Sequence, residues 1–295
     1  MNFNDRSIQV DPKIGLCKLN ELEVPAIGFG TYPLREEACT ESVQEALKAG
    51  YQIFDTATYY ENFKAIAKAL KGQERSRLYL ISKVWHDQQH PEGVRNDLKR
   101  TLLQLETNYL DAYLLHWPNS AISIASTLTA MDELRRERKI RHIGMSNVTV
   151  NHLKRALECQ VPISWVQVEM HPNFCDFDLL AFCSKHSIIV QAWRPLDLGR
   201  VAVDPLFVEI GNRYQKSASQ VALRWIVQHG CIPLPGSKNS AHIQQNREIF
   251  DFMLSEEEMQ TIDNRAKKGK RFRIKAEDGL GFTDEFDFSY EQCWP

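Results

Sequence analysis

Residues 140–158 read IRHIGMSNVTVNHLKRALE, a short apolar run followed by a segment with helical periodicity. Ile140–Met145 is predicted as a buried strand, and Thr149–Glu158 as an amphipathic helix whose N-cap is Asn147 or Thr149. Parallel strands need such a crossover helix, because each new strand must start at the same edge of the sheet as the last. The fold class therefore depends on how often this unit recurs.

The same succession of strand and helix runs through most of the chain. Most of the strands are apolar throughout, which is typical of strands buried on both faces. The predicted strands are Ala26–Gly30, Tyr51–Asp55, Arg77–Val84, Asp111–Leu115, Ile140–Met145, Ser164–Val168, Ile188–Ala192 and Cys231–Leu234. The predicted helices are Glu36–Ala49, Asn62–Leu70, Pro91–Glu106, Ile124–Arg138, Thr149–Glu158, Asp178–His186, Val203–Tyr214, Ser217–Gln228, Ser240–Asn246 and Ser255–Arg265.

Eight strand–helix units in about 225 residues fit a closed parallel (β/α)8 TIM barrel. The alternative is an open doubly wound sheet, which carries a GxGxxG phosphate-binding fingerprint after its first strand. Gly28-Phe29-Gly30 supplies only the first two of those glycines. We predict a single domain over residues 1–295, with the barrel at about 26–265 and a C-terminal tail at 266–295. Leu16–Pro25 is predicted as an N-terminal β-hairpin with Asn20 and Glu21 in its turn.

Composition excludes several other classes of protein. The 295 residues include 36 basic and 38 acidic ones, and a net charge of -2 argues against a nucleic-acid or membrane-surface protein. No apolar run approaches the length of about 18 residues that a transmembrane helix needs, and the polar start, Met1–Lys13, lacks the apolar core of a signal peptide. The seven cysteines are scattered, without CxxC pairs or zinc-ligand spacing. We expect reduced thiols, no metal and a cytoplasmic enzyme.

Polar residues fall at the C-terminal ends of the predicted strands, where (β/α)8 barrels carry their chemistry. Asp55 ends the second strand and is followed by Tyr60, Lys83 lies at the end of the third, and His116 follows the fourth. Any one of these residues alone is more often structural than catalytic. A carboxylate, a phenol, an amine and an imidazole at successive strand ends predict one shared pocket.

Together these four residues suit proton donation to a developing oxyanion. A phenol, with a pKa near 10, is a reluctant acid at neutral pH, and a neighbouring ammonium group lowers that pKa. A carboxylate keeps the ammonium charged, and a neutral imidazole can orient a carbonyl oxygen. Because none of the four is a redox centre, a reduction at this site requires a hydride from a cofactor.

At these residues the sequence resembles the aldo-keto reductase family, from about Gly28 to Arg265. Each motif is weak alone, but their order and spacing together are specific. The motifs are Gly28–Tyr32, Asp55–Ala57 with Tyr60 and Asn62, Ile81–Trp85, Leu114–Pro118, Ile143–Asn147, Gln167–Pro172, Pro233–Asn239, Ile243–Asn246 and Phe250–Phe252. The resemblance implies an NAD(P)H-dependent reductase of aldehydes or ketones, built on a barrel whose mouth is crossed by the C-terminal tail.

The resemblance also implies a role for each residue. Tyr60 would be the general acid, with its pKa lowered by Lys83, which Asp55 holds in an ion pair. His116 would orient the substrate carbonyl. The implied substrate-binding residues are Tyr32, Trp85, His116 and Trp117. The implied cofactor-binding residues are Gly30, Thr31, Tyr32, Asp55, Ser146, Asn147, Gln167, Trp193, Arg194, Pro195, Leu196, Gly236, Ser237, Lys238, Asn239, His242, Gln245 and Asn246.

Three positions depart from the family pattern at the cofactor. Trp193 stands where a tyrosine usually stacks on the nicotinamide ring. Gly236 and His242 replace the lysine and arginine that often clamp the 2′-phosphate of NADPH. Lys238 and Arg194 can supply the missing positive charge, so we expect NADPH as the cofactor, with NADH as the alternative.

The C-terminal tail is rich in charged and aromatic residues. Residues 267–275 contain six basic residues, and residues 276–295 contain six acidic and five aromatic ones, so we hypothesise that the tail shapes substrate choice.

The expected partner is a small-molecule carbonyl compound, bound by a monomer that has no nucleic-acid or membrane partner. Two alternative functions remain, a non-catalytic nucleotide-binding sensor and a barrel lyase or aldolase that uses Lys83 as a Schiff base.

Overall fold

The computed structural model describes residues 8–11, 15–19, 22–119 and 121–271, so the predicted tail from residue 272 onward lies outside the described residues. The chain divides into two compact units. The first contains the described residues up to Gly30, together with Glu41–Phe54 and Val168–Arg271. The second contains Thr31–Thr40 and Asp55–Gln167.

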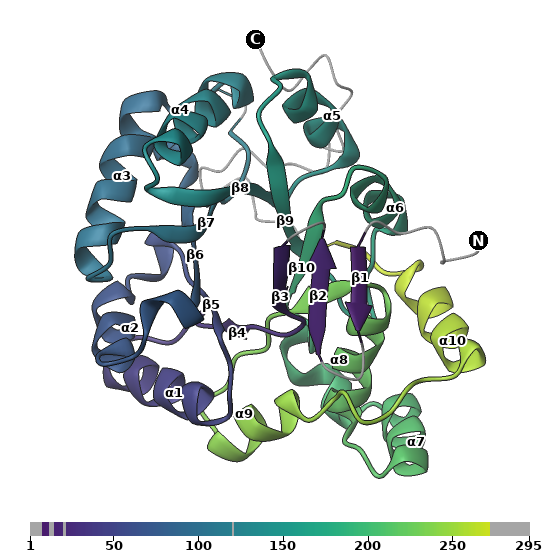
Figure 1. The fold of residues 1–295 in the computed structure, drawn as a ribbon. Coiled ribbons are helices and arrows are strands. Elements are labelled where there is room, and N and C mark those ends of the chain that lie inside the picture. Colours follow the sequence, from purple (N-terminus) through teal and green to yellow (C-terminus); the bar gives the residue numbers. More distant parts are fainter. Residues whose placement is uncertain (1–7, 12–14, 20–21, 120, 272–295) are drawn as a thin grey trace. The chain divides into compact units, whose positions relative to one another are not determined.

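Eight strands form one sheet in chain order (Figure 1). They are β4 (Phe29–Gly30), β5 (Ile53–Asp55), β6 (Tyr79–Val84), β7 (Leu110–Leu115), β8 (Ile140–Ser146), β9 (Ile163–Glu169), β10 (Ile189–Trp193) and β11 (Cys231–Pro233). Strands β6 to β9 pair in parallel, as do β10 and β11. Within the first unit, the backbone N–H groups of Gly28 and Gly30 donate to the carbonyls of Pro233 and Pro235, at 3.0 and 3.1 Å. The segment that contains β4, at one end of the strand order, therefore also bonds to the segment that contains β11, at the other end. The predicted (β/α)8 fold is confirmed.

Helices follow the strands as predicted, with boundaries that differ by a few residues. The α-helices are α1 (Glu36–Lys48), α2 (Phe63–Leu70), α3 (Pro91–Gln104), α4 (Ile124–Arg136), α5 (Val150–Glu158), α6 (Phe177–Lys185), α7 (Pro205–Tyr214), α8 (Ala218–Gln228), α9 (Ser240–Arg247) and α10 (Glu256–Ala266). The 3-10 helices in the described part of the chain are η1 (Thr58–Tyr60), η2 (Arg75–Arg77), η3 (His86–Gln88) and η4 (Asp197–Val203). Among the described residues, no helix is long and apolar enough to cross a membrane.

Side-chain caps set several of the helix starts. Thr149 caps α5 by accepting a hydrogen bond from the backbone of His152, which decides between the two predicted caps. Ser255 and Glu258 form the capping box predicted for α10. Val203 was predicted to open a helix but instead ends η4, because Asp204 is the N-cap of α7.

The N-terminal sheet has one strand more than the predicted hairpin. Strands β2 (Leu16–Leu19) and β3 (Leu22–Pro25) pair antiparallel and confirm the hairpin, although its two turn residues lie outside the described ones. The additional strand, β1 (Ile8–Asp11), pairs antiparallel with β2. The prediction missed β1 because four residues with two apolar positions give a weak signal, and the strand is defined by its partner's hydrogen bonds.

The second unit shows why the apolar runs are strands. All six residues of β7 are buried, and α3 packs against β6 while α4 packs against β8 (Figure 1). A strand covered in this way has no polar face, so its sequence does not alternate. The polar residues of the candidate site lie at the C-terminal ends of these strands.

Gly144 in β8 provides a test of this packing. A Cβ atom at this position would lie 2.6 Å from the carbonyl oxygen of Trp165 and 2.8 Å from its Cβ, so backbone would have to move. Gly144→Ala should lower the free energy of unfolding by about 1–3 kcal/mol in urea denaturation, the usual cost of overpacking. Gly72→Asn is the control, since nothing lies within 4 Å of the Cβ position at Gly72 and asparagine tolerates its positive φ. Equal losses in the two variants would contradict the packing argument.

Candidate active site

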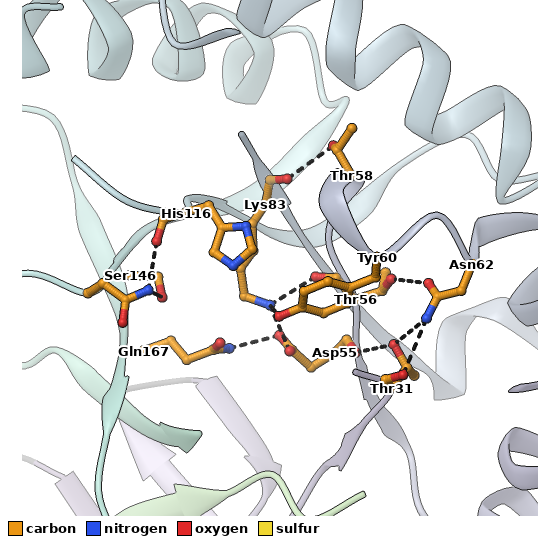
Figure 2. Close-up of polar contacts among 11 residues, drawn as sticks. Thr31, Asp55, Thr56, Thr58, Tyr60, Asn62, Lys83, His116, Ser146 and Gln167 are labelled. Carbon is orange, nitrogen blue, oxygen red and sulfur yellow. Dashed lines mark hydrogen bonds and ion pairs between the residues drawn. The ribbon is translucent and has the colours of Figure 1, made fainter. Parts of the chain in front are cut away.

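The four predicted catalytic residues converge at the strand ends of the second unit. Asp55 ends β5, Lys83 is the penultimate residue of β6, and His116 directly follows β7. Tyr60 ends η1, the short turn after β5. Figure 2 shows the phenol of Tyr60 beside the amine of Lys83, with the imidazole of His116 nearby. The structure therefore brings together side chains that are far apart in the sequence.

The amine of Lys83 lies at the centre of the group. Its Nζ donates to Asp55 Oδ1 at 2.7 Å, to the backbone carbonyl of Thr56 at 2.9 Å and to Tyr60 Oη at 3.3 Å. These three contacts use all the hydrogens of an ammonium group. The Lys83 side chain is fully buried and that of Asp55 is 5% exposed, so each charge depends on the other.

Neighbouring polar residues hold the carboxylate and the start of the turn. Gln167 in β9 donates through Nε2 to the second oxygen of Asp55 at 2.8 Å. Asn62 donates through Nδ2 to Thr31 Oγ1 at 3.0 Å, and its Oδ1 accepts from the hydroxyl of Thr56 at 2.6 Å. The backbone around Asp55 is therefore fixed on both sides (Figure 2).

Burial acts on both members of the ion pair. It raises the pKa of Asp55 and lowers the pKa of Lys83, because desolvation disfavours each charged form. Their direct contact opposes both shifts. The attraction between them and the hydrogen bonds around them are what allow the charges to exist in a buried site.

The expected lowering of the Tyr60 pKa by Lys83 is not found. Burial raises the pKa of Tyr60 well above its usual value, and the negative charge of Asp55 raises it further. The prediction considered the ammonium group alone, whereas in the structure Asp55 offsets that charge and the phenol has lost its solvent. Tyr60 is therefore a protonated phenol at neutral pH, ready to donate its proton.

His116 is a buried, uncharged imidazole. Burial lowers its pKa well below 6.5, and the positive charge of Lys83 lowers it further. Its ring centroid lies 5.7 Å from that of Tyr60, and its buried Nδ1 has no hydrogen-bond partner among the described residues. A neutral imidazole beside a phenol provides a second hydrogen-bonding group for one oxygen atom.

Aromatic rings surround the phenol and the imidazole. Tyr32 lies 5.1 Å from Tyr60 between ring centroids, and Trp85 lies 5.0 Å from His116. Trp117, the third predicted wall residue, is buried directly after His116. Tyr59 was not predicted; its half-exposed ring stacks on Trp85 at 4.2 Å. Only its position next to Tyr60 pointed to it in the sequence.

The side-chain amides predicted to bind the cofactor lie beside His116 and Asp55. Ser146 ends β8 and Asn147 follows it in a left-handed conformation that asparagine tolerates. Asn147 Nδ2 donates to Ser146 Oγ at 3.1 Å and to the carbonyl of His116 at 2.9 Å. A hydroxyl and two side-chain amides, with Gln167 as the second, form a donor and acceptor set that fits a carboxamide.

The other predicted cofactor residues belong to the first unit. Trp193 ends β10, and the guanidinium carbon of Arg194 lies 5.2 Å from the centroid of its ring. Since β10 and β11 are parallel neighbours, the segments that follow them start at the same edge. At Gly30 a Cβ would lie 2.8 Å from the carbonyl oxygen of Leu234, so this position requires glycine.

The start of α9 is exposed and polar. Asn239 caps this helix by accepting from the backbone N–H groups of Ala241 and His242, at 2.9 and 3.2 Å. Lys238 and His242 are exposed at the same end. Helix N-termini favour anions, so this end fits a phosphate group. The remaining predicted residues here and after β10 are Pro195, Leu196, Gly236, Ser237, Gln245 and Asn246.

The chain is similar to known proteins over most of its length. The model of the Aldo/keto reductase family matches residues 26–267. Glyoxal reductase of Bacillus subtilis (strain 168) is 36% identical over 248 residues, which cover 83% of this chain and 90% of that protein. The aldose reductase of Schistosoma japonicum has a TM-score of 0.84 and 29% identity, covering 92% of this chain and 99% of its own. A mutant of Gox0644 in complex with NADPH has a TM-score of 0.82 and 32% identity, and the match covers 86% of this chain and 93% of that chain.

The protonation state of His116 can be measured directly. Because its pKa is lowered, the imidazole should stay uncharged at pH 6, where a free histidine is largely protonated, and should take up its proton only at lower pH. NMR titration of labelled histidine measures this midpoint, and the spectrum of His116→Gln assigns the resonance. A midpoint at 6.5 or higher would contradict the environment described here.

Proposed function

Because the chain belongs to the aldo/keto reductase family, it is an oxidoreductase that reduces an aldehyde or ketone to an alcohol with NAD(P)H, and we propose that Tyr60 is its general acid. The observation that carries this assignment is the contact of 3.3 Å between Tyr60 Oη and Lys83 Nζ. A phenol in contact with a buried ammonium group is placed to lose a proton and to have the resulting charge stabilised.

The reaction needs a proton at the carbonyl oxygen as well as a hydride at the carbon. NADPH, when bound, supplies the hydride. Tyr60 donates its proton to the oxygen as negative charge develops there. Lys83 donates a hydrogen bond to the phenolate that remains, and Asp55 holds the ammonium group in place. The high pKa of Tyr60 in the resting site keeps the proton available until the substrate oxygen can accept it.

His116 orients the substrate. Its neutral ring donates a hydrogen bond to the carbonyl oxygen and fixes the direction from which the oxygen meets the phenol. The nearby Lys83 charge opposes an imidazolium form, so His116 acts here as a hydrogen-bonding group. Tyr32, Trp85 and Trp117 form the apolar walls around the carbonyl.

The proposed cofactor-binding residues fall into two groups. Ser146, Asn147 and Gln167 would hold the carboxamide of the nicotinamide, and Trp193 would lie against its ring. Lys238, with Arg194, supplies the positive charge for the phosphates. The remaining members of the set are Gly30, Thr31, Tyr32, Asp55, Pro195, Leu196, Gly236, Ser237, Asn239, His242, Gln245 and Asn246.

Neither alternative function is favoured by these observations. A lyase or aldolase that forms a Schiff base needs an amine free of its acid partner, whereas Lys83 is bound to Asp55 at 2.7 Å. A non-catalytic sensor does not need a carboxylate, a phenol, an ammonium group and an imidazole in one place.

We also propose the oligomeric state, location and partners of the protein. The chain is a monomer with one barrel domain at about residues 26–265, and it works in the cytoplasm on small carbonyl compounds. It has no nucleic-acid or membrane partner, in keeping with its net charge of -2. The six described cysteines are free thiols, which suits a reducing compartment. The relative named glyoxal reductase makes small dicarbonyl compounds the first substrates to assay.

Tyr60→Phe tests the general acid. Removal of the hydroxyl should lower kcat at least several hundredfold, since general acid catalysis is typically worth about 10²–10⁴ in rate. NADPH oxidation with a panel of aldehydes and keto sugars measures the loss. Tyr59→Phe is the matched control on the same turn, because it removes a hydroxyl and keeps the ring that stacks on Trp85. Turnover of Tyr60→Phe near that of the wild type would overturn the assignment.

Lys238→Met tests the choice of cofactor. The wild type should bind NADPH more tightly than NADH, and the variant should lose about tenfold in affinity for NADPH alone, the value of a hydrogen bond to a charged group. Fluorescence titration gives both Kd values, with Lys268→Met as the control for an exposed lysine elsewhere in the first unit. Equal or tighter binding of NADH by the wild type would contradict the assignment.

A further inference from the structure

Asp97 is a buried carboxylate of the second unit that the proposed reaction does not use. It lies in the middle of α3 and is 2% exposed. A carboxylate this deeply buried costs free energy unless several donors surround it. The hydrogen-bond donors around Asp97 therefore show which parts of the structure this carboxylate links.

Three donors from separate places bind this carboxylate. The phenol of Tyr113 in β7 donates to Oδ2 at 2.6 Å, and the guanidinium of Arg100 donates to Oδ1 at 2.9 Å. The hydroxyl of Thr58 lies 2.9 and 2.8 Å from the two oxygens. Tyr113 and Arg100 belong to regular elements with their own backbone bonds, whereas Thr58 is the first residue of η1.

Thr58 has one hydrogen to donate and two possible acceptors. Its Oγ1 also lies 3.1 Å from the backbone carbonyl of Lys83. The carboxylate of Asp97 is both closer and charged, so it is the stronger acceptor and takes the hydrogen. Thr58 is thereby fixed to α3 while it remains in contact with the strand that carries Lys83.

No side chain caps the start of the turn that carries Tyr60. The turn is three residues long, Ala57 at its N-cap provides no side-chain hydrogen bond, and Glu61 after it has a positive φ of 55°. The contact between Tyr60 Oη and Lys83 Nζ, at 3.3 Å, is already long for a hydrogen bond. A shift of a few tenths of an ångström in the turn would break it.

We infer that Asp97 is a positioning residue: through Thr58 it holds the turn so that the phenol of Tyr60 stays within reach of Lys83. The inference rests on the proposed function, because the position of Tyr60 matters to the rate only if Tyr60 delivers the proton. The hydrogen bonds of Asp97 go to Thr58, Tyr113 and Arg100, and the side chain acts on Tyr60 only through Thr58.

The two conservative changes at Thr58 give the clearest test. Thr58→Val keeps the shape of the side chain and removes the hydroxyl, whereas Thr58→Ser keeps the hydroxyl. We expect Thr58→Val to lower kcat about tenfold or more with little change in KM or in the Kd for NADPH, since small misplacements of a reacting group cost this much. Thr58→Ser should restore the rate to within about threefold of the wild type. The solvent deuterium isotope effect on kcat should rise in Thr58→Val, because proton delivery becomes slower.

Tyr113→Phe is the matched control within the same network. It removes another hydroxyl donor from the same carboxylate and leaves the turn untouched, so it should lower the melting temperature and leave kcat near that of the wild type. Asp97→Ala should lower kcat as much as Thr58→Val does. The variant that combines Asp97→Ala with Thr58→Val should lose no more kcat than either single variant, since both changes break the same hydrogen bond between Asp97 and Thr58. If Asp97→Ala does not fold, the two Thr58 variants and Tyr113→Phe decide.

Three results would overturn the inference. They are equal kcat values for Thr58→Val and Thr58→Ser, a loss in Tyr113→Phe as large as that in Thr58→Val, and additive losses in the double variant. If Tyr60→Phe is inactive while any of these holds, the positioning role of Asp97 fails and the general acid stands. If Tyr60→Phe is fully active, the proposed function itself fails.

Discussion

The buried ion pair between Lys83 and Asp55 is the interaction on which the rest of the site depends. Both charges have left water, and each is kept by the other and by a few fixed hydrogen bonds, from Gln167 to the carboxylate and from the amine to the carbonyl of Thr56. Because Asp55 ends β5 and Lys83 lies near the end of β6, the pair also fixes two neighbouring strand ends. Loss of either partner would leave a buried charge without compensation.

The same burial determines the state of the other two residues. It raises the pKa of Tyr60, so the phenol holds its proton, and it lowers the pKa of His116, so the imidazole carries no charge. A protonated donor and a neutral orienting group are the two forms that reduction of a carbonyl requires at neutral pH. The burial of the site therefore provides both without a separate mechanism for each.

Residues outside the four catalytic candidates fix the backbone segments that carry them. Asn62 and Thr31 hold the backbone at Asp55, Asn147 holds the carbonyl of His116, and Asp97 holds the turn of Tyr60 through Thr58. Each link joins a side chain to a loop at a strand end. A barrel provides the strand ends, and such links fix the loops to within the distances that proton transfer demands.

The sequence alone determined the succession of strands and helices and the four polar residues at or just after three strand ends, because apolar runs, helix caps and strand-end positions are local features. It did not determine β1, whose four residues become a strand only by pairing with β2. It also predicted the wrong direction for the pKa of Tyr60, since that depends on burial and on the charge of Asp55. The contact between Asp97 and Thr58 joins positions 39 residues apart, and only the tertiary structure brings them together.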